Sequence, residues 1–165
     1  MNTLDTLDAQ SARYIGMIDQ ASAQLGELLD ELGLAARIEG GRYDPALREV
    51  GTAEVAEYAR DHLGEDRVGV AGSGAPVLVD VDATKRAFSS LVQCALRHGG
   101  LERVDVEVDG ARLRVAPITP ASAPVVLGRE LRDLGAATAV RLIGALGGSV
   151  GVREEILTVE LPTPT

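Results

Sequence analysis

Residues 134–148 read LGAATAVRLIGALGG. Small and aliphatic side chains fill this stretch and two glycines close it, which is typical of a buried helix with a glycine stop. We therefore predict a helix from about Leu131 to Leu146. The segments that follow it, Ser149 to Arg153 and Ile156 to Leu161, predict a β-hairpin at the end of the domain.

The region before this helix predicts helices that alternate with pairs of strands. Helices packed on one face of a mostly antiparallel sheet make an α+β fold, a two-layer α/β sandwich. The expected elements are a helix from Thr52 to Leu63 capped by Thr52, a hairpin of strands 67–71 and 77–81 around the turn 72–74, a helix capped by Asp82, and a hairpin of strands 104–108 and 112–115 joined by Asp109-Gly110.

The first segment carries an apolar repeat with alternating spacings of three and four, which predicts a long helix with an a/d heptad seam. We expect it to pair with a second helix or with a second copy of the chain; the alternative is that it packs on its own domain. We divide the chain into this dimerisation helix, residues 1–41, and a domain, residues 42–165. The seam consists of Leu4, Leu7, Ser11, Tyr14, Ile18, Ala21, Leu25, Leu28 and Leu32.

The charge and composition exclude several classes of partner. The net charge of −9 disfavours nucleic acid and anionic membrane surfaces, because a phosphate backbone is met by Lys and Arg patches. A single cysteine, Cys94, allows no disulfide within the chain and is expected as a buried, hydrophobic thiol. With no long apolar run and no signal-peptide pattern at its start, the chain is expected to be cytoplasmic.

Three strings, taken in order, resemble the catalytic module of two-component histidine kinases, which are GHKL ATPases. Residues 29–41, LDELGLAARIEGG, resemble the exit of the second dimerisation helix. Residues 89–98, SSLVQCALRH, resemble the N box, the family's magnesium-binding helix. The stretch 134–148 resembles the family's glycine-rich helix of the second glycine box, and the later Val159-Glu160-Leu161-Pro162 resembles the end of the family's closing strand. This resemblance implies the histidine-kinase-type ATPase fold.

The residues that the resemblance assigns to ATP are altered in this chain. The asparagine that would coordinate magnesium is Cys94, and a thiol is a poor ligand for that hard ion. No Asp, Glu, Asn or Gln occurs from Ala111 to Arg129 to accept the adenine amino group. We expect no catalytic residue, no nucleotide or other cofactor, and no metal ligand. The degenerate ATP-site positions are Ser90, Cys94, Ala116, Asp133 and Gly135.

The phosphoacceptor expected from the resemblance is missing as well, since the chain has no histidine before His62. His62 and His98 lie near predicted helix ends and lack the sequence context of a phosphorelay histidine. The scaffold is similar to bacterial phosphotransferases with a lost ATP site, but those keep the histidine. Whether a histidine-bearing helix precedes this chain in a longer protein stays open.

We therefore predict a catalytically inactive pseudokinase that acts as a dimeric interaction module in bacterial two-component-type signalling. Its expected partner is a response regulator, a kinase or another regulatory protein. The alternatives are a divergent but functional ATP-binding kinase or phosphotransferase fragment, and a small-ligand sensor on the same fold.

The loop that would form the ATP lid is short and apolar. It runs from about Pro117 to Gly128 and contains three prolines, which restrict its freedom. We expect Val125, Val126 and Leu127 to fold over the N-box helix near Cys94 and to fill part of the former ATP volume.

Overall fold

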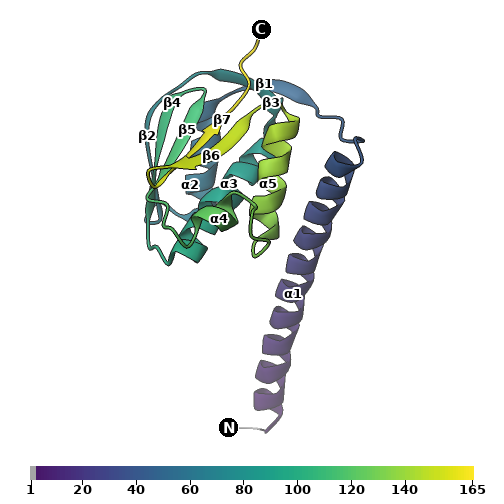
Figure 1. Cartoon of the computed structure of the whole chain (residues 1–165). Helices are drawn as coiled ribbons and strands as arrows, with labels where there is room; N and C mark the ends of the chain where they lie inside the picture. The colour runs from purple at the N-terminus through teal and green to yellow at the C-terminus, as the bar shows by residue number, and fades with distance from the viewer. Residues whose placement is uncertain (1–2) are drawn as a thin grey trace.

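The computed structural model describes residues 3–165, apart from the side chains of residues 4, 5 and 7. A long helix, α1 (Thr3–Glu39), precedes a domain of helices and strands and extends away from it (Figure 1). No helix in the described part of the chain combines the length and the apolar character that crossing a membrane requires.

The main sheet has five strands in the order β2-β4-β5-β7-β6. The pair β2–β4 is parallel, and the other three pairings are antiparallel. The strands are β2 (Val68–Gly74), β4 (Val104–Gly110), β5 (Arg112–Ala116), β6 (Ser149–Arg153) and β7 (Ile156–Glu160).

Alternation along the strands separates the two faces of this sheet. In β4, the valines at 104, 106 and 108 are buried, while the acidic residues between them are exposed. On the outer face, Arg114 of β5 places Nη2 3.1 Å from Oδ2 of Asp109 and Nη1 3.6 Å from Oε2 of Glu107. The outer face is therefore polar, and the inner face carries the core.

Helices cover the inner face of the sheet (Figure 1). They are α2 (Thr52–Leu63), α3 (Val81–Gly99), the single turn α4 (Ala123–Val126) and α5 (Leu134–Ala145). The largest fully buried side chains of the helices come from α3 and α5, among them Phe88, Leu91, Leu142 and Ile143. This arrangement confirms the predicted α+β two-layer fold.

One predicted hairpin is wrong. The segments around residues 72–74 do not pair with each other: β2 pairs with β4, and β3 (Pro76–Asp80) pairs antiparallel with β1 (Leu47–Gly51), a strand that the sequence analysis missed. Gly72 has φ of 100°, and a Cβ there would collide with the backbone of Val108. The glycine therefore permits close pairing of β2 with β4 instead of forming a hairpin turn.

Two predicted helix caps also differ in the structure. Asp80, not Asp82, caps α3, and its Oδ1 accepts a hydrogen bond from the Ala83 amide at 3.4 Å. Gly51 precedes α2, and the fully buried Thr52 hydroxyl instead donates to the Gly110 carbonyl at 2.5 Å. The last long helix begins at Leu134, three residues later than expected, because the side chain of Asp133 caps it.

The other two predicted hairpins are confirmed. Asp109 pairs with Arg112, so the chain turns from β4 to β5 at Gly110 and Ala111, one residue later than predicted, with Gly110 at φ of 58°. Glu154 and Glu155 form the tip between β6 and β7, and both have positive φ.

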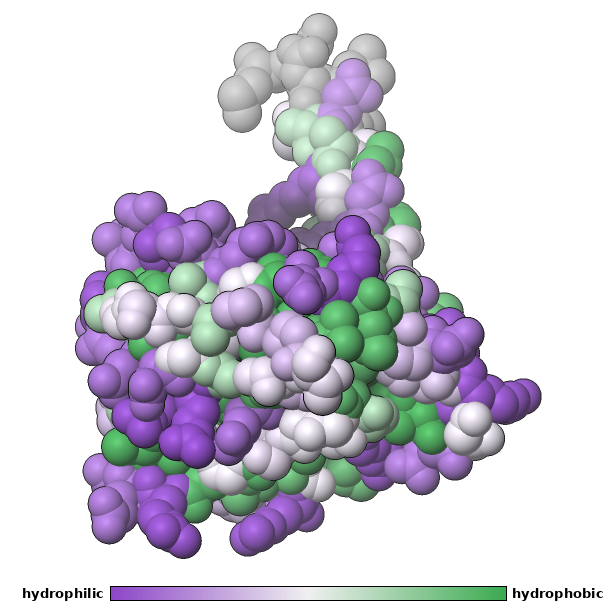
Figure 2. Space-filling view, turned by 90° about the horizontal axis from the view of Figure 1, so that it is seen from above, coloured by the Kyte–Doolittle hydropathy of each residue, from purple (hydrophilic) through white to green (hydrophobic). Residues whose placement is uncertain are grey.

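The last turns of α1 pack against the domain. Ala35 is buried, and Leu34 and Ile38 are packed against the core from its edge. An ion pair of 3.2 Å between Arg141 Nε and Glu39 Oε1 links this end of α1 to α5. Residues 8–30 are all exposed, so most of the helix has no packing partner within the chain. Figure 2 shows apolar and polar side chains mixed along the part of α1 that extends behind the domain.

Candidate functional site

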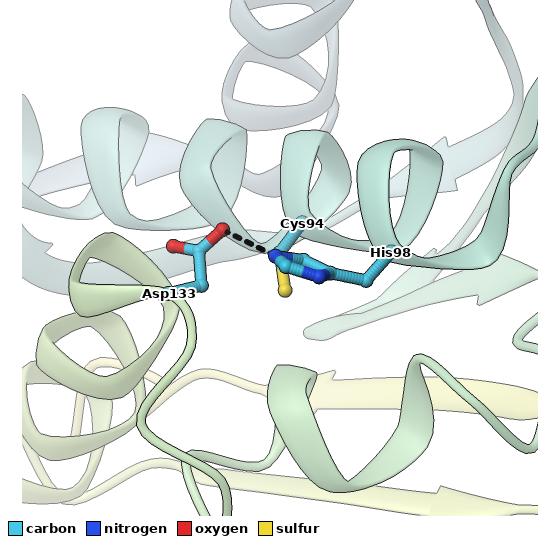
Figure 3. A group of neighbouring side chains, drawn as sticks. All are labelled: Cys94, His98 and Asp133. Carbon is cyan, nitrogen blue, oxygen red and sulfur yellow. Dashed lines mark ion pairs between the residues drawn. The ribbon is translucent and has the colours of Figure 1, made fainter.

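The most concentrated group of reactive side chains lies where α3 meets the start of α5. Cys94 and His98 are four residues apart on α3 and therefore project from the same helix face. Asp133, immediately before α5, faces them from the opposite side (Figure 3). One ligand-type atom from each residue, the thiol sulfur, an imidazole nitrogen and a carboxylate oxygen, lie within 4.8 Å of one another.

The two oxygens of Asp133 have different roles. Oδ1 accepts a hydrogen bond from the Ala136 amide at 3.0 Å and so caps α5. Oδ2 lies 3.4 Å from His98 Nε2 and 3.9 Å from Arg97 Nη1. The side chains of Asp133 and His98 are 11% and 19% exposed, so the pair is largely shielded from water.

The Nε2 atom of His98 has no hydrogen-bond partner in the described structure, although it is buried. Nε2 lies close enough to Oδ2 of Asp133 for an ion pair, but the two groups are not aligned for a hydrogen bond. Buried polar atoms in native proteins nearly always have a hydrogen-bond partner, so a buried ring nitrogen without one, beside a thiol and a carboxylate, is unusual.

Cys94 is fully buried, as predicted. Its burial, and then the charge of Asp133 and a hydrogen bond to that carboxylate, raise the pKa of the Cys94 thiol to about 12. The thiolate is the nucleophilic form of cysteine, so this side chain is a poor nucleophile at neutral pH.

The structure brings four of the five predicted ATP-site positions to the junction of α3 and α5. Ser90 and Cys94 lie one turn apart on α3, and Asp133 and Gly135 lie at the beginning of α5. A Cβ on Gly135 would lie 3.4 Å from the Ser90 Cβ and 3.1 Å from Oε1 of Glu31, which belongs to α1. The fifth position, Ala116, ends β5 and belongs to the sheet.

Glu31 adds negative charge beside this junction. Partial burial, and then the charges of Asp133 and Glu27, raise the pKa of the Glu31 carboxyl above its ordinary value. The region at the start of α5 therefore combines carboxylates from two separate segments of the chain.

The loop after β5 is folded down, as the sequence analysis expected. Val125 and Val126 of α4 are fully buried, Leu127 is half-buried, and α4 packs against α3 and α5. Ser122 is also buried: its amide donates to Thr119 Oγ1 at 3.2 Å, and the Thr119 amide donates to Ser122 Oγ at 3.1 Å. That the valines occupy former ATP volume stays a prediction.

A broad, open groove of about 870 Å³ runs between α1, α3 and α5. Its walls include Glu27 and Glu31 of α1, Ser90 and Gln93 of α3, and Gly135 and Thr138 of α5. Residues of α2 line the groove as well, so it is surrounded by polar groups from four helices.

The predicted dimer-interface residues are exposed wherever their side chains are described. Leu4 and Leu7 fall outside the described side chains. The others are Tyr14 at 54%, Ile18 at 63%, Leu25 at 61%, Leu28 at 44% and Leu32 at 51% exposure.

Three further apolar side chains of α1 are exposed beside the seam: Ile15, Met17 and Leu29. They flank the a and d positions, so the apolar face is wider than a strict a/d seam. The pairing of this face with a partner stays a prediction.

Comparison with known proteins identifies the fold. No protein-family model matches the chain, and no curated protein matches its sequence. Among solved structures, the histidine kinase AdeS of Acinetobacter baumannii has a TM-score of 0.67 at 16% identity, with 92% of this chain and 84% of that chain covered. Full-length ShkA in complex with AMPPNP also has a TM-score of 0.67, at 20% identity, with 93% and 39% covered.

The ATP-binding domain of PrrB from Mycobacterium tuberculosis has a TM-score of 0.56 at 16% identity, with 73% of this chain and 99% of that chain covered. The chain therefore has the fold of a histidine-kinase-type ATPase module, which confirms the fold implied by the sequence resemblance. It spans 39% of the length of ShkA, a much longer protein.

The cluster of Cys94, His98 and Asp133 was not predicted from the sequence. The spacing of four between Cys94 and His98 on a predicted helix was the available signal for two of its members. Asp133 could not be added from spacing, because it comes from another element.

Proposed function

We propose that this chain is a catalytically inactive histidine-kinase-like protein that acts as a dimeric, cytoplasmic interaction module in bacterial two-component-type signalling. The partner class that suits such a scaffold is a response regulator, a kinase or another regulatory protein. The proposal combines two properties, the loss of nucleotide chemistry and a helix available for association.

The burial of Cys94 is the observation that carries the first property. This side chain is 0% exposed at the position that the resemblance assigns to the magnesium ligand. Magnesium requires oxygen ligands, and a thiol of raised pKa offers none. Asp133 also places a carboxylate at the start of α5, where it would repel the phosphates of ATP at a helix end otherwise suited to anions.

The lid supports the same conclusion. A loop that closes over nucleotide needs to open, but here α4 is anchored by two fully buried valines and by the bonds between Thr119 and Ser122. Gly128 lies so close to α5 that a Cβ on it would be 3.2 Å from the Ala137 Cα. Opening this loop would expose apolar surface, which is unfavourable.

The exposed apolar face of α1 supports the second property. Contiguous apolar surface on a soluble chain commonly marks an interaction site. The face lies on a helix whose residues 8–30 are exposed throughout, so a partner helix can approach it without rearrangement of the domain.

A divergent but functional kinase or phosphotransferase fragment is the main alternative, because active kinases share this fold and the fold alone does not separate the two. A small-ligand sensor is a further alternative, favoured by the polar groove of about 870 Å³ between α1, α3 and α5.

Phosphoryl transfer from radiolabelled Mg-ATP tests the proposal. The chain should incorporate no phosphate, either alone or when it is mixed with a histidine-bearing dimerisation domain. Acid-labile incorporation that depends on the chain would contradict the proposal and favour the functional kinase.

A further inference from the structure

The cluster at the junction of α3 and α5 has a composition that its role in packing does not require. A buried thiol needs only apolar neighbours, and a helix cap needs only one carboxylate oxygen. Here a thiol, an imidazole nitrogen and a second carboxylate oxygen converge within 4.8 Å (Figure 3). Among the side chains that the structure describes, this is the one such group of three.

We propose that Cys94, His98 and Asp133 form a binding site for a divalent transition-metal ion, with Zn²⁺ as the preferred ion. Cysteine sulfur, histidine nitrogen and aspartate oxygen are the three ligand types that zinc uses in proteins. The thiolate makes the set unsuitable for Mg²⁺ and Ca²⁺, which take oxygen ligands.

The distances agree with this assignment. In tetrahedral zinc sites with bonds of about 2.0–2.3 Å, ligand atoms lie roughly 3.3–3.8 Å apart. The Oδ2–Nε2 separation of 3.4 Å already falls in that range. The whole group, within 4.8 Å, needs only small side-chain rotations to close around an ion. Three protein ligands leave a fourth position for water or another group.

The surroundings hold one of the ligands in place and leave a second one without a hydrogen bond. Oδ1 of Asp133 is fixed by the Ala136 amide, so Oδ2 is directed toward His98. The buried Nε2 of His98 lacks a hydrogen-bond partner and would gain one strong interaction on binding an ion. Partners of this kind that orient a ligand are a regular part of metal sites.

Charged groups near the cluster act on a cation in both directions. Glu31 lies beside the start of α5 and adds a nearby carboxylate. Arg97 opposes binding because its Nη1 is 3.9 Å from Oδ2 of Asp133, but its side chain is 62% exposed and can turn into solvent. On binding, the Cys94 S–H bond breaks, the sulfur bonds to the ion, and the proton leaves to solvent, with no change of oxidation state.

A bound ion would link α3 directly to the start of α5. The segment between α4 and α5, residues 127–133, ends at Asp133 and would be fastened with it. Metal occupancy would therefore stabilise the packing of the closed loop. This inference is independent of dimerisation through α1.

Titration of the metal-free full chain with Co²⁺ tests the proposal, because cobalt bound to a thiolate absorbs in the near ultraviolet. Cys94 is the single cysteine, so that band can arise from no other residue. We expect one Co²⁺ per chain, a thiolate-to-cobalt band, and displacement of the band by Zn²⁺. Absence of the band with excess Co²⁺ would overturn the proposal.

Variants distinguish a metal site with three protein ligands from metal binding by the Cys94 thiol alone. Cys94→Ala should abolish the band, and His98→Ala and Asp133→Asn should each weaken binding by about tenfold or more. Asp133→Asn keeps an oxygen that can cap α5, so its effect reports on the ligand rather than on folding. The matched control is His62→Ala, because His62 is the chain's other histidine and is exposed; this variant should bind Co²⁺ like the wild-type chain. Binding that is unaffected by both His98→Ala and Asp133→Asn would overturn the three-residue site.

Discussion

Replacing Leu25 and Leu28 with Asp should convert the chain from a dimer to a monomer. The two side chains lie one turn apart on α1 and are 61% and 44% exposed, so together they offer about the surface of one whole leucine side chain. Burying a leucine contributes about 2 kcal/mol, and a symmetric dimer buries the pair twice. The loss is therefore about 4 kcal/mol, which corresponds to a roughly thousandfold weaker dimer before any cost of burying the new carboxylates.

Light scattering coupled to size exclusion, over a range of protein concentrations, measures this directly. The wild-type chain should have twice the 17.2 kDa mass of one chain, and the variant should have that single mass. The matched control is Gln20→Asp with Ala23→Asp, which adds the same charges at the same spacing on the opposite face of α1 and should remain dimeric. Circular dichroism should show that both variants stay folded.

Two results would refute this reasoning. A wild-type chain that is monomeric at high micromolar concentration would mean that the exposed face of α1 does not mediate self-association. Dissociation of the control to the same extent as the seam variant would mean that added charge, rather than lost apolar contact, drives the change.

Three further predictions concern Glu31 of α1 and two buried residues of the domain, Val126 and Cys94. Glu31→Gln in the metal-free protein should raise the unfolding temperature more at pH 7 than at pH 4. The pKa of the Glu31 carboxyl in the folded protein is above its ordinary value of 4.5, so its ionisation destabilises the folded protein as the pH rises above 4.5. Equal increases of the unfolding temperature at both pH values would contradict this. Val126→Ala should lower the free energy of unfolding in urea by about 2 kcal/mol, because the side chain is fully buried, whereas a change near zero would mean that α4 is not packed. Cys94 in the metal-free native protein should resist a thiol reagent at neutral pH and react fully in denaturant, because the side chain is buried and the pKa of its thiol is raised to about 12. Rapid reaction of Cys94 with the reagent in the native protein would contradict its burial.

Local patterns predicted most of the fold. The Asp109-Gly110 turn and the alternation of valines with acidic residues in β4 identify a hairpin from neighbouring residues alone. The pairing of β2 was predicted wrongly, because a strand that ends in glycines before the next strand has the same sequence pattern as a hairpin with a glycine turn. Only the close approach of Gly72 to Val108, more than thirty residues later, distinguishes the two arrangements.

The candidate site was predicted only in part, because local sequence patterns contain burial along a helix but not contacts between distant elements. The burial of Cys94 followed from the apolar face of its helix, and the packing of Val125 and Val126 followed from the apolar loop. The approach of Asp133 to His98 depends on how α5 packs against α3, and no local pattern contains that information. The role of Asp133 as a helix cap was missed because the helix was expected to begin before it.

Calorimetric titration with Mg-ATP tests the central claim, loss of the nucleotide site, most directly. With a thiol in place of the magnesium ligand and no carboxylate or amide side chain between residues 111 and 129 to accept the adenine amino group, we predict no binding heat up to about 1 mM nucleotide. An active kinase domain of the same fold, titrated in the same buffer, is the positive control. Saturable binding by this chain with a dissociation constant of about 10 μM would contradict the account and identify the chain as a divergent ATP-binding module.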